Sequence, residues 1–391
     1  MDPLSWILSA MVLGLGALIV FYCGSYFKHT NKYSGAFAAQ LIAFAGVMFG
    51  LVTADDMMVM FVFWEITSIL SYLLIGFTNN RLSSRRSALQ ALIVTTAGGL
   101  AMFIGLIMLG EASGSYLFSE VIARAPETIA DPGAADSLRA ALVLGLVGAL
   151  SKSALVPLLF WLPGARAAPT PVSAFLHAAA MVKAGIYLVA RLSPAFAGVT
   201  PWTEMVALLG LFTMLYGGYV ALKQTDLKLI LAYGTVSQLG FISTVVAFGT
   251  PSALYAGLAM MVAHALFKSV LFLVTGIIDH QAGTRDIRRL SGIYRRTPLL
   301  FVMSLISAAS MAGLPPLLGF VSKEAVIELV FDGAAAGGLG ALGTGATWTV
   351  LAAVCVGSVL TLAYSARFVW GAFAVKPTSF AHPETITDGR V

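Results

Sequence analysis

Charge is scarce in this chain: only 10% of its 391 residues are Asp, Glu, Lys or Arg, whereas 59% are apolar. Soluble domains contain about 25% charged residues, so this composition excludes an ordinary soluble protein. The mean hydropathy of +0.90 leads to the same conclusion. The chain is therefore predicted to be a membrane protein that crosses the bilayer several times.

Cysteine and nucleotide-binding motifs are also lacking. Cys23 and Cys355 each stand alone in an apolar run, which excludes a disulfide framework and leaves no pair spaced for zinc or iron–sulfur ligation. No glycine-rich phosphate-binding loop is present. The net charge of +5 comes from basic residues in short loops, so it does not indicate a nucleic-acid partner. We therefore expect no cofactor and no metal.

Long apolar runs fill most of the sequence. A helix needs about 20 residues to cross a ~30 Å hydrocarbon core, and most of the runs reach this length. The start lacks the basic region and cleavage site of a removable signal peptide, so the first run is expected to be retained. The fold class predicted is all-α, polytopic, with about 11–12 transmembrane segments. They lie near 4–27, 34–54, 57–77, 87–110, 138–157, 171–190, 203–222, 229–248, 253–278, 297–314, 317–331 and 347–370.

Basic residues fall in alternate loops. The short loops around 28–32, 81–86, 166, 223–228 and 285–296 carry Lys and Arg, which places them on the cytoplasmic side by the positive-inside rule. The loops between them then lie outside. The longest of these, 111–137, contains Pro126 and Pro132-Gly133 and is expected to be irregular.

Two segments interrupt the helical pattern in a similar way. Lys152 is followed by four prolines up to Pro171, and Met311 is followed by Gly313, Pro315 and Pro316 shortly before Lys323. Proline removes a backbone donor and clashes with the preceding turn, so both segments are predicted to be broken helices. Matching breaks in transporters mark two inverted repeats around a substrate cavity. The alternative is that the prolines only kink ordinary membrane helices.

Glu65 and Lys152 are ionisable residues within the membrane. Glu65 follows the Asp55-Asp56 boundary by about nine residues, or roughly 14 Å of helix, which puts it near the bilayer midplane. Burial disfavours a charged carboxyl group, whereas a nearby lysine favours it, and Lys152 is the partner expected. The pair is predicted to take part in ion movement. The alternative is a fixed ion pair that only orients helices.

Further buried lysines and histidines continue the series. Lys183 lies among small residues that leave room for water. Lys268 follows His264 by four residues, so both project from one helix face and are expected to exchange a proton through one water. Lys323 follows the second break with Glu324 beside it, and because consecutive helical residues point apart, one of the two is expected to face the interior and the other the surface. His177 is a weaker relay candidate, with a packing role as the alternative.

Several motifs resemble one known family. These are Phe63-Trp64-Glu65-Ile66-Thr67-Ser68, Ser151-Lys152-Ser153-Ala154, Trp161-Leu162-Pro163 with Pro169-Thr170-Pro171, Thr225-Asp226-Leu227-Lys228, His264-Ala265-Leu266-Phe267-Lys268 and Gly319-Phe320-Val321-Ser322-Lys323-Glu324. In order and spacing they resemble the antiporter-like subunits shared by Mrp-type Na⁺/H⁺ antiporters and respiratory complex I. The first motif and Met181-Val182-Lys183-Ala184-Gly185 are most similar to the large A-type component of the Mrp complex.

The resemblance implies a fold, site roles and partners. The family fold has fourteen helices, with two inverted five-helix repeats that each hold a broken helix. Glu65 matches the acidic residue that pairs with the broken-helix lysine, Lys152 matches that lysine, and Lys323 matches the terminal lysine of the second broken helix. Lys183, His264 and Lys268 match the central relay. The implied partners are other membrane subunits of a hetero-oligomeric Mrp-like complex, the lipid bilayer, protons and Na⁺.

The chain also departs from the family pattern. It begins at what resembles the third family helix, so residues 1–375 are expected to form one antiporter-like domain without the first two helices, followed by a polar tail at 376–391. The expected product is a fragment or truncated protein.

The function expected is that of a proton-translocating subunit of a cation/proton antiporter in a bacterial inner membrane, and not an enzyme. The alternatives are a proton-pumping membrane subunit of an NADH-dehydrogenase- or hydrogenase-like redox complex, and a membrane scaffold whose charges only pair.

Overall fold

A computed structural model describes residues 2–27, 34–78 and 80–376. Its helices are α1 (Pro3–Tyr26), α2 (Ser34–Thr53), α3 (Met57–Ile75), α4 (Leu82–Ser113), α5 (Phe118–Ala130), α6 (Ala135–Lys152), α7 (Trp161–Gly164), η1 (Ala165–Ala167), α8 (Thr170–Ala174), η2 (Phe175–Ala179), α9 (Lys183–Phe196), α10 (Trp202–Lys223), α11 (Leu227–Val246), α12 (Pro251–Ala282), η3 (Ile293–Arg295), α13 (Pro298–Ala312), α14 (Leu318–Ala335) and α15 (Thr344–Phe373). A two-stranded hairpin, β1 (Gly338–Leu339) and β2 (Leu342–Gly343), precedes α15.

The all-α, polytopic fold class is confirmed. Within the described residues, nine helical segments are long and apolar enough to cross a membrane, and α13 is a shorter apolar helix. Helices α8, η2 and α9 together form one of the nine segments, Thr170–Phe196, which is buried along its whole apolar stretch. The predicted tail from residue 377 onward lies outside the described residues.

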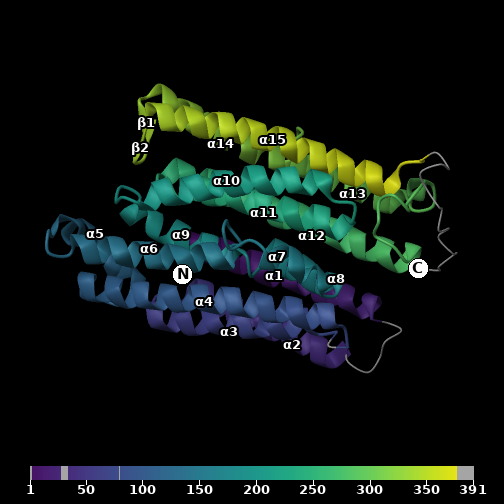
Figure 1. Ribbon diagram of the computed structural model, residues 1–391, viewed down its shortest axis with the longest axis horizontal. Coiled ribbons are helices and arrows are strands. Elements are labelled where there is room, and N and C mark those ends of the chain that lie inside the picture. Colours follow the sequence, from purple (N-terminus) through teal and green to yellow (C-terminus); the bar gives the residue numbers. More distant parts are fainter. Residues whose placement is uncertain (1, 28–33, 79, 377–391) are drawn as a thin grey trace.

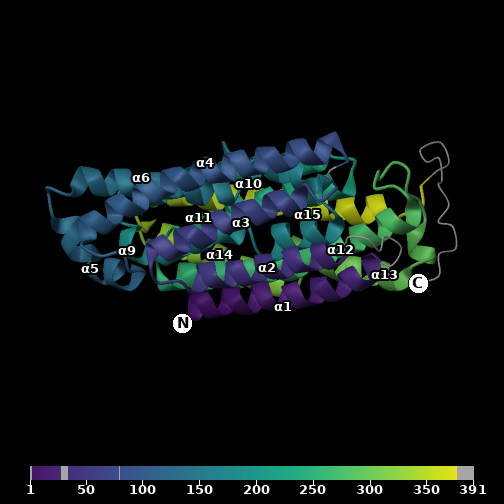
Figure 2. The ribbon, with the colours of Figure 1, turned by 90° about the horizontal axis from the view of Figure 1, so that it is seen from below.

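The long helices run side by side along one axis (Figures 1 and 2). Helix α5 and the β-hairpin lie at one end, here named the α5 end, whereas the loop 283–297 lies at the opposite end, here named the loop end (Figure 1). Helices α2, α3 and α4 form one flank and α14 and α15 the other, with α9, α11 and α12 between them (Figure 1). The buried charges lie in this middle layer and on the helices that border it.

The same order of elements occurs twice, from α2 to α9 and from α10 to α15. Each half has two helices of about 20 residues, a 32-residue helix, a broken helix and a further long segment. In both halves an aspartate, Asp56 or Asp226, caps the second helix by accepting two backbone N–H bonds. Each of these aspartates also forms an isolated β-bridge with the chain just beyond the 32-residue helix, at Leu117 or Asp286.

The two halves are inverted relative to each other. Asp56 bridges to Leu117, just before α5, whereas Asp226 bridges to Asp286, in the loop that follows α12. These sites are at opposite ends of the molecule (Figures 1 and 2). The second helix of one half therefore runs antiparallel to the second helix of the other, as the predicted inverted repeats require.

Both predicted helix breaks are present. Helix α6 ends at Lys152, and Ala154 adopts a left-handed backbone conformation with φ of 52° before the short helices α7 and α8. Helix α13 ends at Gly313, whose φ of 84° suits glycine because it has no β-carbon. Leu318 then begins α14. The prolines after each break cannot donate the hydrogen bonds that would continue the helix.

One prediction about the loops was wrong. Residues 111–137 were expected to be irregular, but they contain α5, a 13-residue helix with Pro126 inside it. Its buried residues, Phe118, Val121 and Ala125, recur at three- and four-residue spacing and pack against the bundle. This amphipathic stripe forms a helix despite the proline.

Candidate functional site

The four lysines predicted to carry protons are buried inside the helical bundle. The exposed fraction is 0% for Lys152, Lys183 and Lys268 and 6% for Lys323. Each ammonium group donates a hydrogen bond to a main-chain carbonyl oxygen. None of these lysines takes part in the ion pairs found among the described residues. A buried lysine without a touching carboxylate exchanges its proton more readily than one in an ion pair.

Lys152 occupies the last position of α6, at the first helix break. Its Nζ donates to the Trp64 carbonyl oxygen at 2.9 Å and to the Ser68 Oγ at 2.7 Å, both on α3. The Trp64 ring lies below the ammonium group, 5.0 Å from Nζ to the ring centroid. Two oxygen acceptors and an aromatic face therefore solvate the ammonium group within the protein.

Glu65 lies on the same helix as Trp64 and Ser68, but its carboxyl group points toward α4. There it contacts Gly99, where an added β-carbon would overlap Glu65 Oε1. That oxygen is buried and has no hydrogen-bond partner in the part of the chain that the structure describes. The expected direct Glu65–Lys152 ion pair is not formed, because Lys152 is held by Trp64 and Ser68 while Gly99 leaves room for the carboxylate on the other side. Lys152 still acts on Glu65 through its charge.

Lys183 and His264 are in direct contact. Lys183 Nζ lies 2.8 Å from His264 Nδ1, and it also binds the Ala178 carbonyl oxygen. An ammonium group has only donors, so when Lys183 is charged Nδ1 accepts and the imidazole proton is on Nε2. His264 Nε2 is buried and has no partner. The contact joins a helix of the first half to a helix of the second.

The structure agrees only in part with the expected proton exchange between His264 and Lys268. Both side chains project from α12 one turn apart, but the His264 ring is directed to Lys183 and not to Lys268. Lys268 Nζ donates to the Leu231 carbonyl oxygen at 3.0 Å and lies 5.7 Å from the Tyr364 ring centroid. The sequence spacing identified the shared face correctly but could not reveal the contact with another helix.

His177 lies in η2, a π-helical turn between the first broken helix and α9. It is 1% exposed, both ring nitrogens lack hydrogen-bond partners, and its ring packs edge-on against Phe272. The charges that act on it are Lys228, Lys268 and Lys183. The packing alternative and the relay alternative are both compatible with this position.

Lys323 and Glu324 separate as predicted for consecutive helical residues. Lys323 is buried and donates to the Ala312 carbonyl oxygen at 3.1 Å, at the C-terminal end of α13. That carbonyl group has no partner within its own helix, so the lysine satisfies it. Glu324 is exposed on the opposite side of α14.

Comparison with known proteins assigns the family. A family described as NADH:quinone oxidoreductase/Mrp antiporter, transmembrane, matches residues 54–349. This chain is a member of that NADH:quinone oxidoreductase/Mrp antiporter family. It is 42% identical to a probable K⁺/H⁺ antiporter A/B subunit of Rhizobium meliloti (96% of this chain, 36% of that protein). It is 40% identical to the Na⁺/H⁺ antiporter A1 subunit of Staphylococcus haemolyticus (98% of this chain, 49% of that protein).

Two solved structures share the fold of this member of the NADH:quinone oxidoreductase/Mrp antiporter family. The Mrp complex from Dietzia sp. DQ12-45-1b matches with a TM-score of 0.88 and 40% identity, over 97% of this chain and 41% of that chain. The membrane-bound sulfane sulfur reductase, an archaeal respiratory membrane complex, matches with a TM-score of 0.82 and 25% identity, over 98% and 75%. The chain spans half or less of the length of the antiporter relatives it matches.

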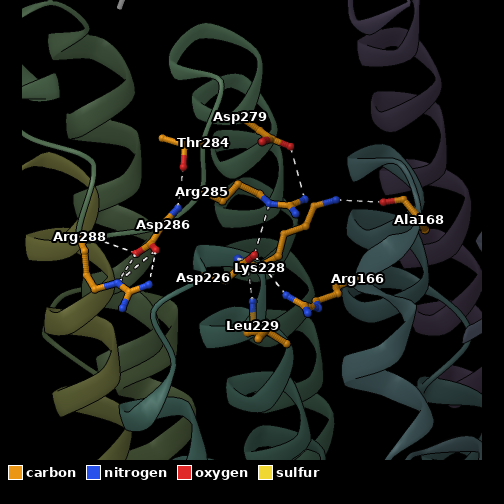
Figure 3. Close-up of polar contacts among 10 residues, drawn as sticks. All are labelled: Arg166, Ala168, Asp226, Lys228, Leu229, Asp279, Thr284, Arg285, Asp286 and Arg288. Atoms are coloured by element: carbon orange, nitrogen blue, oxygen red, sulfur yellow. Dashed lines mark hydrogen bonds and ion pairs between the residues drawn. The ribbon is translucent and has the colours of Figure 1, made fainter. Parts of the chain in front are cut away.

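A network of charged side chains in this protein was not predicted from the sequence. At the loop end, Asp226 lies between Arg166 and Arg285, at 3.3 and 3.6 Å (Figure 3). Lys228 is 2% exposed and donates to the Ala168 carbonyl oxygen at 3.0 Å (Figure 3). The network thus ties the first broken helix to the start of α11. Its one sequence signal was Asp226 at the start of a helix, where an aspartate is a typical cap.

Proposed function

We propose that this chain is a proton-translocating subunit of a multisubunit cation/proton antiporter in a bacterial cell membrane. Protons move along Lys152, Lys183, His264, Lys268 and Lys323, and Glu65 controls the charge of Lys152. The other partners are further membrane subunits of an Mrp-like complex. The 40–42% identity to Na⁺/H⁺ and K⁺/H⁺ antiporter subunits supports this choice.

The observation that carries the proposal is the 2.8 Å contact between Lys183 and His264. Both groups are fully buried, and each can give up or take a proton, Lys183 as an ammonium or an amine and His264 at either ring nitrogen. The contact also crosses between the two halves of the fold. A proton can therefore pass from the first repeat to the second without leaving the protein.

A redox-driven role is the second candidate. It is supported by the likeness to the sulfane sulfur reductase complex, where this chain covers 75% of the matched chain. The two candidates differ in what drives proton movement. An antiporter subunit responds to added Na⁺ or K⁺ in the absence of a redox substrate, whereas a redox-driven subunit does not.

The test measures cation-dependent proton movement in everted membrane vesicles that contain the assembled complex. A proton gradient is imposed, NaCl or KCl is added, and a pH-sensitive dye reports proton release. Lys152→Ala is expected to reduce release at least about tenfold, since removing one relay group breaks the route. Lys223→Ala, at a lysine on the end of α10 that lies outside the relay, is the matched control. Normal release from Lys152→Ala with normal assembly would refute the relay.

A further inference from the structure

Two polar stripes face each other near the α5 end, and of their residues only Lys183 belongs to the relay. On α1 and its cap, Asp2, Ser5 and Ser9 lie three and four residues apart and so share one helix face. On α9, Lys183, Tyr187 and Arg191 lie four residues apart and share another. We name these six residues the outer seam.

Direct contacts hold the two stripes together. Arg191 forms an ion pair with Asp2, whose other carboxylate oxygen caps α1 through the Ser5 N–H at 2.8 Å. The Tyr187 hydroxyl donates to the Val52 carbonyl oxygen at 3.1 Å, near the end of α2. Deeper in the bundle, α1 packs against η2, the turn whose Ala178 carbonyl oxygen binds Lys183.

The seam contains buried polar atoms without protein partners. The Ser9 hydroxyl group is buried at 5% exposure, and neither it nor Arg191 Nε has a hydrogen-bond partner among the described residues. In a membrane protein such groups are costly unless water or another polar group reaches them. The polar residues of the seam follow one another at one-turn intervals along α1 and α9, and water between Lys183 and the surface would supply the missing hydrogen bonds of these atoms.

Arg191 closes the seam at the surface. Its side chain is 13% exposed and lies between Asp2 and Asp55, with the nearest Asp55 oxygen 3.9 Å away. The Phe118 and Tyr187 rings flank it, each centroid 5.8 Å from the guanidinium carbon. Asp55 is in turn held by the Ser119 N–H at 3.0 Å. One arginine thus joins α1, the α2–α3 turn, α5 and α9.

We propose that the outer seam is a proton outlet from Lys183 to the face of the membrane at the α5 end, with Arg191 as its gate. The positive-inside rule assigns this face to the outside. The Lys183 ammonium group loses a proton to water and becomes a neutral amine. The proton then passes through water between Ser9 and Tyr187 to an Asp2 or Asp55 carboxylate, and from there to the outer solution. This outlet rests on the proposed proton-relay function.

The first test measures water access to the seam without measuring transport. Ser9→Cys is made in the complex together with Cys23→Ala and Cys355→Ala, so that residue 9 is the cysteine of this chain that can be labelled. A membrane-impermeant methanethiosulfonate reagent with a trimethylammonium group is then applied to right-side-out vesicles and, separately, to everted vesicles. Labelling is expected only from the outer face, and Arg191→Gln is expected to raise its rate about tenfold. The control protein keeps Ser9 and carries Cys355→Ala, so that it retains native Cys23. This cysteine is buried on the other half of α1 and should stay unlabelled.

The second test removes one hydroxyl group. Tyr187→Phe keeps the ring that flanks Arg191 and is expected to lower cation-driven proton release about tenfold, whereas Tyr216→Phe, exposed on α10, leaves it unchanged. Arg191→Lys, which keeps the charge, covers the case in which Arg191→Gln fails to assemble, and should give an intermediate labelling rate.

The outcomes separate the outlet from the proposed function. The outlet is overturned if Ser9→Cys stays unlabelled from the outside when it is combined with Arg191→Gln. It is also overturned if Ser9→Cys is labelled equally from both faces. Wild-type proton release from Tyr187→Phe overturns it as well. If labelling occurs from outside but no cation releases protons from any variant, the water path stands and the antiporter function falls.

Discussion

Gly99 provides the space that separates Glu65 from Lys152, and its replacement by alanine is the most informative single change. An added β-carbon would overlap Glu65 Oε1 and lie 3.2 Å from the Glu65 carboxyl carbon and 3.4 Å from Trp64 Cδ1. The carboxyl group would have to leave this position. Because Lys152 is the charge that acts on Glu65, the carboxylate is expected to move toward it.

The size of the effect follows from packing. Forcing one extra methyl group into a filled interior costs about 1–3 kcal/mol. At about 1.4 kcal/mol per factor of ten, the balance between the separated and paired positions shifts by about 5- to 150-fold toward the pair. An ion pair holds the proton on Lys152, so cation-driven proton release should fall by about tenfold or more.

The assay is the same dye measurement in everted vesicles, with complex assembly checked by native gel electrophoresis. Gly46→Ala, on α2, is the matched control because no atom lies within 4 Å of its added β-carbon. Wild-type proton release from Gly99→Ala, in a complex that assembles normally, would refute this reasoning.

Three further predictions concern polar contacts. Ser68→Ala removes one acceptor from the Lys152 ammonium group, a contact worth about 1.5–3 kcal/mol, so proton release should fall about tenfold, and Ser68→Thr should restore it. Asp226→Asn keeps the helix cap but loses the negative charge that faces two arginines, whereas Asp226→Ala loses both. The cap contributes about 1 kcal/mol to the free energy of unfolding, so the thermal midpoint of the solubilised protein should decrease less in Asp226→Asn than in Asp226→Ala. Equal midpoints would contradict the role of Asp226 as a cap. The Arg288 side chain holds the pKa of Asp286 below its ordinary value, so this loop contact is fully present above about pH 4 and is lost only as the pH falls further. After correction for the intrinsic dependence of amide exchange on pH, hydrogen exchange of the 283–292 amides should therefore be the same at pH 7 and pH 5. Faster corrected exchange at pH 5 would contradict the prediction.

The broken helices and the buried lysines were predictable from the sequence because their signals are local. The several prolines and glycines after Lys152 and before Lys323 favour a break in the helix, because each proline removes a backbone donor and clashes with the preceding turn. A lysine deep in an apolar run must face the protein interior, since lipid cannot solvate it. Both signals depend on residues within one segment of the chain.

The partners of these residues were not predictable in the same way. Lys152 binds Trp64 and Ser68 instead of Glu65, and His264 binds Lys183. These choices depend on how far each helix is rotated and on the space left by Gly99 on a neighbouring helix. A single sequence gives the face of a residue on its own helix but not the facing residue on the next.

Lys183→Arg tests most directly whether Lys183 passes protons, which is the central claim. Arginine keeps the positive charge and the donors that face His264 and Ala178, but it does not deprotonate in proteins. Cation-driven proton release in everted vesicles is measured for the wild type, Lys183→Arg and Lys183→Ala in assembled complexes. Both variants are expected to lose release at least about tenfold. Wild-type release from Lys183→Arg would contradict the claim, because a lysine that only holds helices together can be replaced by another cation.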